Sequence, residues 1–220
     1  FYEALRQQAL ENIAGDKEKN SRQIRILAEI MRLRRACCNP KLIDQALNIS
    51  SSKEQVFSEV VDELLGGGHK ALVFSQFTGH LALLRRFLEE KKVSYRYLDG
   101  STAAAQRQRQ VEEFQAGEAD FFLISLKAGG LGLNLTAADY VIHMDPWWNP
   151  AVEDQAADRA HRIGQTRPVT VYRLVTADTI EEKIVRLHQE KRTLAQSLLE
   201  GADASARFSA DELLELIRYH

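Results

Sequence analysis

The stretch Phe121-Phe-Leu-Ile-Ser-Leu-Lys-Ala-Gly-Gly-Leu-Gly-Leu-Asn134 decides the fold, because it joins a short apolar run to a glycine-rich loop. A continuous apolar run of this length is typical of a strand that is buried on both faces of a parallel sheet. The glycines permit positive φ angles, so successive backbone N–H groups can converge on a phosphate oxygen. The same residues also fit a tight turn that binds nothing, and the loop alone does not choose between these interpretations.

Similar apolar runs alternate with amphipathic helices on both sides of this stretch. The expected strands are 71–74, 95–98, 121–125, 140–144 and 170–175, and the expected helices are 81–90, 103–115, 151–163 and 179–199. Strands that alternate with helices indicate βαβ units. The predicted fold class is therefore α/β, a parallel sheet with helices on both faces, preceded by a small helical segment.

Three segments are expected along the chain. Residues 1–66 form a helical segment, with helices over 2–14, 21–36 and 51–65, the last one opened by the capping box Ser51-x-x-Glu54. The triple glycine at 66–68 ends it, and the lobe that contains the sheet follows over 67–177. Residues 178–220 hold the long helix and a short terminal helix, which the capping box Ser209-x-x-Glu212 opens.

Composition excludes several classes of protein. The 220 residues are 45% hydrophobic and 27% charged, which is typical of a globular protein with a substantial core. The first twenty residues are charged throughout and contain no secretory signal, and no apolar run is long enough to span a membrane. Since the chain begins at Phe1 and not at a methionine, we expect it to be a fragment of a longer protein.

The cysteines and the net charge bear on compartment and partners. Cys37 and Cys38 are adjacent, which suits neither a disulfide framework nor the usual spacing of zinc ligands. The expected location is therefore intracellular: the cytoplasm or nucleoid of a bacterium, or the nucleus of a eukaryote. The net charge of −2 neither supports nor excludes nucleic acid, so any such contact would use a local groove.

Ligands of open α/β sheets bind beyond the carboxyl ends of the strands, which directs attention to 75–78, 99–102, 126–136 and 145–150. Gly130-x-Gly132 lacks the third glycine of a dinucleotide-binding fingerprint, and the chain has no Gly-x4-Gly-Lys-Ser/Thr phosphate loop. No metal-ligand spacing exists among the six histidines. A nucleotide would therefore have to be held largely by another domain.

Asp145-Pro-Trp-Trp-Asn-Pro150 combines a helix start with two consecutive tryptophans. Asn149 is a suitable N-cap and Pro150 a suitable first helical residue. The simpler interpretation of the tryptophans is one core ring and one partly exposed ring. The functional interpretation is an aromatic side chain that props or stacks on a nucleic-acid strand.

The segment Gln155-Ala-Ala-Asp-Arg-Ala-His-Arg-Ile-Gly-Gln165 has the sharpest pattern. Gln155, Arg159 and Arg162 stand at i, i+4 and i+7, and are expected on one face of one helix. Local physics favours a structural interpretation, in which Asp158 pairs with Arg162 and the arginines complement the carboxyl end of the helix. The alternative is a pair of arginine fingers, which stabilise charge on a transferring γ-phosphate.

Taken together, these motifs resemble the C-terminal helicase motifs of Swi/Snf-type DNA-dependent ATPases, which are helicase-like translocases of superfamily two. The stretches that carry the resemblance occur in the family's order and are 74–77, 98–102, 125–136, 145–150 and 155–165. Leu33-Arg-Arg-Ala-Cys-Cys-Asn-Pro40 resembles the helical segment before that lobe, although Asn39 stands where the family often has histidine. The helix from Thr179 resembles one that braces the two lobes of these motors.

The resemblance implies a RecA-like lobe and assigns roles to particular residues. Arg159 and Arg162 match the arginine fingers, and Gln155 matches the glutamine on the nucleotide side. Gly130, Gly132 and Asp158 fall in the motifs at the nucleotide cleft. The residues implied at the surface that binds duplex DNA are Ser75, Gln76, Ser101, Thr102, Lys127, Trp148 and Asn149.

The function implied by the resemblance is the second motor lobe of an ATP-driven translocase on double-stranded DNA, which remodels chromatin or other protein–DNA complexes. ATP and Mg²⁺ would be bound mainly by the N-terminal RecA-like lobe of the same polypeptide. The full-length protein would be a DNA-stimulated ATPase, and this chain alone would be inactive. No membrane partner is implied.

Two other functions stay open at this point. One is a non-catalytic module, derived from such a motor, that binds nucleic acid or a protein partner. The other is a small enzyme that acts on a phosphate ligand, for which the glycine loop has no accompanying nucleophile, base or metal set. The motor interpretation would fail if Arg159 and Arg162 were both sealed inside the fold.

Overall fold

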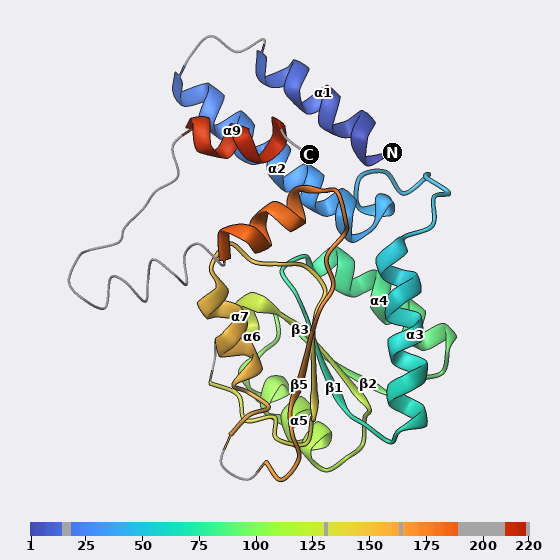
Figure 1. The fold of residues 1–220 in the computed structure, drawn as a ribbon. Helices are drawn as coiled ribbons and strands as arrows, with labels where there is room; N and C mark the ends of the chain where they lie inside the picture. The colour runs from blue at the N-terminus through green and yellow to red at the C-terminus, as the bar shows by residue number, and fades with distance from the viewer. Residues whose placement is uncertain (15–18, 130–131, 163–164, 189–209, 219–220) are drawn as a thin grey trace, which may run out of the picture. The chain divides into compact units, whose positions relative to one another are not determined.

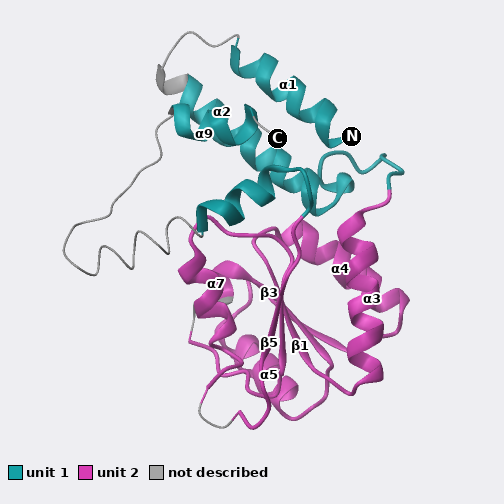
Figure 2. Ribbon diagram, viewed as in Figure 1, with its two compact units in different colours: residues 1–49, 176–220 teal, residues 50–175 magenta. Residues whose placement is uncertain are grey.

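The computed structural model describes residues 1–14, 19–129, 132–162, 165–188 and 210–218, and the chain divides into two compact units (Figures 1 and 2). The sheet unit comprises residues 50–175, and the helical unit comprises residues 1–49 and 176–220. The sequence-based boundary after residue 66 differs from this division, since the helix before it groups with the sheet.

The sheet unit is built on five parallel strands, as the apolar runs predict. The strands are β1 (Ala71–Ser75), β2 (Tyr95–Leu98), β3 (Phe121–Ser125), β4 (Tyr140–His143) and β5 (Thr170–Arg173), in the order β2-β3-β1-β4-β5. β1 lies at the centre, with Ala71 opposite Phe121 of β3 and Tyr140 of β4. The α/β class is confirmed, and β4 and β5 end one and two residues earlier than expected.

Helices cover both faces of this sheet (Figure 2). One face carries α3 (Ser52–Gly66) and α4 (Thr78–Glu90), and the other carries α5 (Ala104–Gln115), the short α6 (Leu126–Gly129) and α7 (Pro150–Ala157). Side chains of β1 alternate between the two cores: Leu72 and Phe74 pack towards α5, whereas Ala71 and Val73 pack towards α3 and α4. Every strand with a fully buried pattern thus serves two cores, which explains its continuous apolar sequence.

The first helix of the sheet unit, α3, explains where the unit begins. Ser51 is its N-cap and accepts a hydrogen bond from the N–H of Glu54 at 3.3 Å, as the capping box predicts. Phe57, Val61 and Leu64 recur at helical spacing and are fully buried in the sheet's core. This apolar stripe needs the sheet to cover it, so α3 groups with the sheet.

The helical unit contains α1 (Tyr2–Ala14), α2 (Lys19–Cys38), the 3₁₀ turn η1 (Pro40–Leu42), a helix over 180–188 and α9 (Ala210–Arg218). Its ends are tied together: Arg6 donates to the carbonyl of Ile217 at 3.0 Å, and the Tyr2 hydroxyl accepts from the N–H of Ile180 at 2.8 Å. Cys37 and Cys38 are buried, and neither forms a disulfide within the described part of the chain. Ser209, the expected cap of the terminal helix, and the expected helix beyond residue 188 lie outside the described residues.

No helix within the described ranges combines the length and apolar character needed to cross a bilayer.

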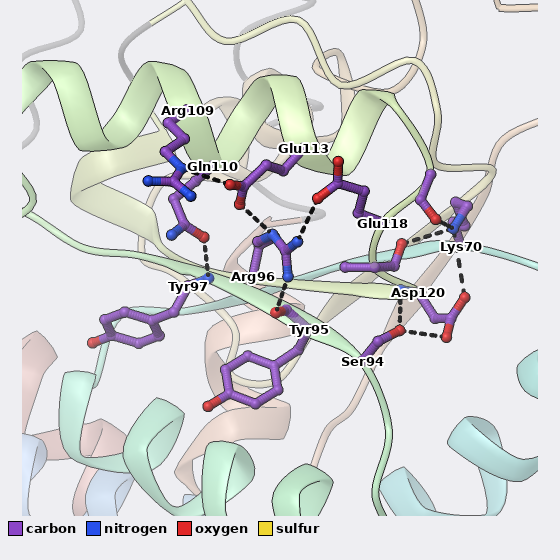
Figure 3. Close-up of polar contacts among 12 residues, drawn as sticks. Lys70, Ser94, Tyr95, Arg96, Tyr97, Arg109, Gln110, Glu113, Glu118 and Asp120 are labelled. Carbon is purple, nitrogen blue, oxygen red and sulfur yellow. Dashed lines mark hydrogen bonds and ion pairs between the residues drawn. The ribbon is translucent and has the colours of Figure 1, made fainter.

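One edge of the sheet is formed by β2, and side chains bond two of the backbone groups on its outward side (Figure 3). The Gln110 side-chain oxygen accepts from the N–H of Tyr97 at 3.4 Å, and the Arg96 guanidinium donates to the carbonyl of Tyr95 at 3.1 Å. Arg96 also pairs with Glu113 at 2.8 Å and Glu118 at 3.1 Å. These side chains cap a strand edge that would otherwise be a template for pairing with another chain.

Candidate functional site

The loops singled out in the sequence follow neighbouring strands and lie at one edge of the sheet. β3, β1 and β4 are adjacent and parallel, with Ser75 opposite Ser125 and Phe74 opposite His143. Because parallel strands end at the same edge, the loops at 126–136 and 145–150 both begin there, on either side of the end of β1. The topology therefore brings the glycine loop and the tryptophan loop together.

The glycine loop begins with a short helical turn, α6. The hydroxyl of Ser125 accepts a hydrogen bond from the N–H of Ala128 at 3.3 Å and thereby caps this turn. Lys127 points an exposed side chain outward, while Ala128 is buried in the core. Gly132 has a φ of +72°, in the left-handed region that favours glycine. Gly130, the other predicted nucleotide-side glycine, lies outside the described residues.

The expected helix over 151–163 is shorter than its sequence pattern suggests. α7 ends at Ala157, and Asp158 is its C-cap, so Gln155 lies on the helix whereas Arg159 and Arg162 lie beyond it. The prediction that all three share one helix face is therefore wrong. The cause is tertiary: the carbonyl of Arg159 accepts from the N–H of Leu135 at 2.9 Å. That bond joins the segment to the glycine loop in place of continuing the helix.

Further hydrogen bonds join the two segments beyond this point. The Arg162 guanidinium contacts the carbonyl of Gly132 at 3.5 Å, a long bond. The side-chain amide nitrogen of Gln165 donates to the carbonyls of Ala138 at 2.7 Å, Thr136 at 3.1 Å and Ala160 at 3.3 Å. Sequence reasoning missed this role of Gln165. The carbonyls of Thr136 and Ala138 lie more than twenty residues before it, and no local spacing relates a side chain to groups that far away.

The two arginines differ in exposure. Arg159 is 4% exposed and its Nε has no hydrogen-bond partner among the described residues, whereas Arg162 is exposed. Burial lowers the pKa of Arg159, the nearby charge of Arg162 lowers it further, and Asp158 opposes this in part. Arg162 thus meets the expectation of an accessible guanidinium, and Arg159 is covered. The motor interpretation would have failed if both arginines were buried inside the fold. Arg162 is exposed, so that interpretation stands.

This pair of guanidinium groups fits an anionic ligand. A buried cation without an acceptor is costly, and a second cation beside it raises that cost. In the described part of the chain, neither Arg159 nor Arg162 forms a salt bridge with a carboxylate, so the Asp158–Arg162 pair expected from spacing is not formed. A polyphosphate would supply the missing negative charge, because the guanidinium fork matches phosphate oxygens.

The tryptophan loop is held by a buried carboxylate. Glu153 is 1% exposed, accepts from the N–H of Trp147 at 2.7 Å, and forms a two-pronged ion pair with Arg173 of β5 at 2.5 and 2.7 Å. Trp147 packs against the core, and Trp148 is half-buried. Asn149 is exposed and caps α7 by accepting from the N–H of Ala151 at 3.1 Å, as predicted. The simpler interpretation, one core ring beside one partly exposed ring, describes this loop only in part, because Trp147 is itself half-buried.

In the loop after β1, the Ser75 hydroxyl and two backbone N–H groups are bonded internally, whereas the Gln76 side-chain amide is buried without a hydrogen-bond partner among the described residues. The Ser75 side chain is fully buried, and its hydroxyl accepts from the N–H of Phe77 at 3.1 Å. The N–H of Gln76 donates to both carboxylate oxygens of Asp145, at 3.1 and 3.2 Å. Ser75 therefore shapes this loop from inside, and Gln76 links it to the tryptophan loop.

The turn after β2 is organised around Asp99. Its Oδ1 accepts from the N–H of Ser101 at 2.8 Å, from the hydroxyl of Ser101 at 2.6 Å and from the hydroxyl of Thr102 at 3.4 Å. The hydrogen bond from the Ser101 hydroxyl, followed by others and against the effect of burial, lowers the pKa of Asp99. Ser101 is exposed and Thr102 is half-buried, so the turn presents Ser101 outward.

A hollow of about 560 Å³ lies along the edge strand β2. None of the predicted site residues lines it. Its walls are Arg85, Val93, Ser94, Tyr95, Arg96, Tyr97, Gln106, Gln110 and Glu113. The Arg85 guanidinium stacks over the Tyr97 ring at 4.8 Å, so the hollow is a feature of the capped edge and separate from the loops described above.

Comparisons with known proteins identify the family. Residues 52–164 match the helicase conserved C-terminal domain. An uncharacterized ATP-dependent helicase of Mycoplasma pneumoniae is 38% identical over 218 residues, which is 98% of this chain and 21% of that protein. The human lymphoid-specific helicase is 40% identical over 232 residues, covering 94% of this chain and 27% of that protein. The chain thus spans about a quarter or less of these relatives.

Solved structures of the same family are similar to this chain in fold and in sequence. The Sulfolobus solfataricus SWI2/SNF2 ATPase core in complex with double-stranded DNA is 31% identical, with a TM-score of 0.79 over 100% of this chain and 47% of that chain. The C-terminal domain of the same ATPase is 29% identical, with a TM-score of 0.78, and the match covers 100% of this chain and 92% of that domain. The expected RecA-like fold is confirmed. The chain belongs to the helicase conserved C-terminal domain family and is the C-terminal RecA-like lobe of a Swi2/Snf2-type ATPase.

Proposed function

We propose that this chain is the second motor lobe of an ATP-driven translocase on double-stranded DNA, and that it supplies Arg159 and Arg162 to the transferring γ-phosphate. The observation that carries the proposal is a buried Arg159 guanidinium that has no acceptor at Nε and a second guanidinium close by. Gln155, Asp158, Gly130 and Gly132 belong to the nucleotide side of the same site.

The contribution of this lobe is electrostatic. ATP, bound mainly by the N-terminal lobe together with Mg²⁺, supplies the phosphoryl group that is hydrolysed. Arg162 is exposed and accessible to the nucleotide, whereas Arg159 is buried and its Nε lacks an acceptor. Fixed guanidinium groups stabilise the charge that develops on the equatorial oxygens in the transition state.

DNA is proposed to bind across the loops at the same edge of the sheet. Lys127, Ser101 and Asn149 are exposed there, and Trp148 is half-buried. Gln76 contributes through its link to Asp145, and Ser75 and Thr102 act by shaping their turns. Contacts of this kind reach phosphates and carry little sequence information, so the motor is expected to act on protein–DNA complexes of varied sequence.

The proposal is tested in the full-length protein by steady-state ATP hydrolysis with and without duplex DNA. Arg159→Ala and Arg162→Ala should each lower the DNA-stimulated kcat by about a hundredfold or more, because an arginine finger contributes roughly 10³ to 10⁵ in rate. Arg109→Ala is the matched control, since Arg109 is exposed on α5 of the same unit and its guanidinium pairs with Glu113 on the same helix.

Full DNA-stimulated hydrolysis by either variant would show that the substituted arginine does not stabilise the transition state. If the full-length parent protein bound duplex DNA but hydrolysed no ATP, the chain would instead be a binding module derived from a motor. Nuclear or nucleoid localisation of the full-length protein would agree with a DNA substrate.

A further inference from the structure

We propose that Gln165 is a positioning residue that fixes the arginine segment, residues 158–162, against the glycine loop. This inference rests on the proposed function, because it concerns where Arg159 and Arg162 are held. Gln165 itself touches no nucleotide in this scheme. It acts through the backbone that carries the two arginines.

The Gln165 side chain is fully engaged with backbone groups. Its amide nitrogen donates to the carbonyls of Ala138 at 2.7 Å, Thr136 at 3.1 Å and Ala160 at 3.3 Å. Its amide oxygen accepts from the N–H of Arg167 at 2.9 Å. One half-buried side chain thus bridges the exit of the glycine loop, the turn between the two arginines, and the approach to β5.

The arginine segment needs such a bridge because α7 does not extend through it. After Ala157 the backbone bonds are short turns, such as Arg159 N–H to Ala156 at 3.2 Å and Ala160 N–H to Ala157 at 3.0 Å. Cross-links to the glycine loop therefore set its position: Leu135 to the carbonyl of Arg159, and Gln165 to the carbonyl of Ala160. A misplacement of about 1 Å at a catalytic group can lower a rate about a hundredfold.

Gln115 provides a matched comparison within the same chain. Its amide nitrogen donates to the Thr136 hydroxyl at 3.1 Å, and its amide oxygen accepts from the N–H of Ala137 at 2.8 Å. Gln115 therefore holds the same exit of the glycine loop, with the same chemistry. Both of these bonds lie outside the arginine segment, so removing the Gln115 side chain loosens the loop without freeing Arg159 and Arg162.

The test uses the full-length protein with the substitutions Gln165→Ala, Gln165→Lys, Gln165→Glu and Gln115→Ala, and with Arg159→Ala as a reference. Two quantities are measured: kcat and KM for ATP in the presence of duplex DNA, and amide hydrogen exchange without nucleotide in peptides that span 133–139. The second readout includes exchange of the Leu135 N–H, which donates to the Arg159 carbonyl, and does not depend on activity.

Gln165→Ala should lower kcat about tenfold or more, with KM changed less than about threefold, because the ground-state hold on ATP lies mainly in the other lobe. Exchange in the 133–139 peptide should rise. Gln165→Lys keeps a donor for the carbonyls and should recover part of the rate, whereas Gln165→Glu offers only acceptors to them and should be the most impaired. Gln115→Ala should keep kcat within about twofold.

Three results would overturn the inference. In the first, Gln165→Ala keeps the rate while Arg159→Ala loses it; the positioning role then fails and the proposed function stands. In the second, Gln115→Ala loses as much rate as Gln165→Ala, which indicates general loosening of the loop. In the third, Arg159→Ala retains full hydrolysis, and the proposed function and the positioning role fail together.

Discussion

At the scale of single residues, Asp139 shows a charge held by fixed partners at the amino-terminal edge of the sheet. Its carboxylate accepts from the N–H of Lys70 at 3.1 Å and contacts the His69 ring at 2.7 Å and the Arg167 guanidinium at 3.1 Å. Burial alone would raise the pKa of Asp139, but these hydrogen bonds outweigh it, so the pKa is lowered. The ionised form therefore stabilises the fold.

Asp139→Asn should lower the free energy of unfolding by about 1–3 kcal/mol at neutral pH, the usual range for a hydrogen-bonded charge. A lowered folded-state pKa means that the contribution is complete above the unfolded value, near 3.9, and is lost as pH falls through the lower folded value. The difference between the parent chain and Asp139→Asn should therefore shrink only in strong acid. Urea unfolding followed by circular dichroism at pH 7, 4 and 3 measures it.

The control is Asp62→Asn, which removes an exposed carboxylate paired with Lys91 at 2.6 Å. A surface pair of this kind contributes about 0–1 kcal/mol, so its effect should be small at every pH. A difference for Asp139→Asn that grew on acidification would contradict the assignment of a stabilising carboxylate.

Residue identities in the site could be proposed from the sequence, but their contacts could not. The spacing of Arg159 and Arg162 allowed a pair of arginine fingers, but local physics favoured a structural interpretation, and the assignment came from the family resemblance. Two of the three carbonyls that Gln165 bonds lie 27 and 29 positions away in the chain, and the third, of Ala160, lies five positions away. Such contacts have no periodic signature.

At the scale of elements, the edge strand β2 illustrates how a short strand is protected. Gln110 and Arg96 bond its outward N–H and C=O groups, and Arg96 is fixed in turn by Glu113 and Glu118 (Figure 3). Without these side chains, the edge would offer unpaired backbone groups beside two tyrosine rings. Exposed edges of this kind promote association between chains.

The double substitution Arg96→Ala with Gln110→Ala should therefore increase self-association of the chain. We expect a larger mean mass by light scattering coupled to gel filtration, increasing with protein concentration. Arg109→Ala is the control, because its side chain is 79% exposed and bonds Glu113 without touching the β2 backbone. A strictly monomeric double variant at every concentration would show that side-chain caps are not what keeps this edge closed.

Element types followed from the sequence more reliably than element ends. β1, β3 and β4 are largely buried apolar runs because they lie inside the sheet, whereas the edge strands β2 and β5 are only partly buried and more polar. The end of α7 was missed because its sequence continues in helical spacing through Arg162, while the Leu135 N–H captures the Arg159 carbonyl from outside the segment. A tertiary hydrogen bond of this kind overrides local propensity.

At the scale of the whole molecule, the net charge of −2 limits how DNA can be bound. A chain without a general basic excess can attract duplex only through a local set of donors, so few counterions should be displaced. The proposed surface contains one exposed lysine, Lys127, beside neutral polar groups. Binding by this lobe should therefore be weak and only moderately sensitive to salt.

Lys127→Ala should weaken binding of the full-length protein to duplexes of unrelated sequence by a similar factor. It should also reduce the slope of log K against log salt by about one, as expected for one phosphate contact. Fluorescence anisotropy with two labelled duplexes over a range of salt measures both quantities. Weakening confined to one of the duplexes would indicate that Lys127 reads bases, and an unchanged slope would place it away from the phosphates.

The strands are parallel, so the loops of the candidate site follow their carboxyl ends and lie at the edge of the sheet opposite the turns that precede their amino ends. A label or tether can be attached at those turns. The turns at 91–93 and 116–118 each enter the amino end of a strand, and they contain left-handed residues, Lys92 with a φ of 57° and Gly117 with a φ of 87°. Ala116 is exposed in one of them, and both native cysteines are buried. A dye or surface tether coupled at position 116 through an introduced cysteine would leave the opposite rim clear, so single-molecule recordings could test whether this lobe moves on DNA.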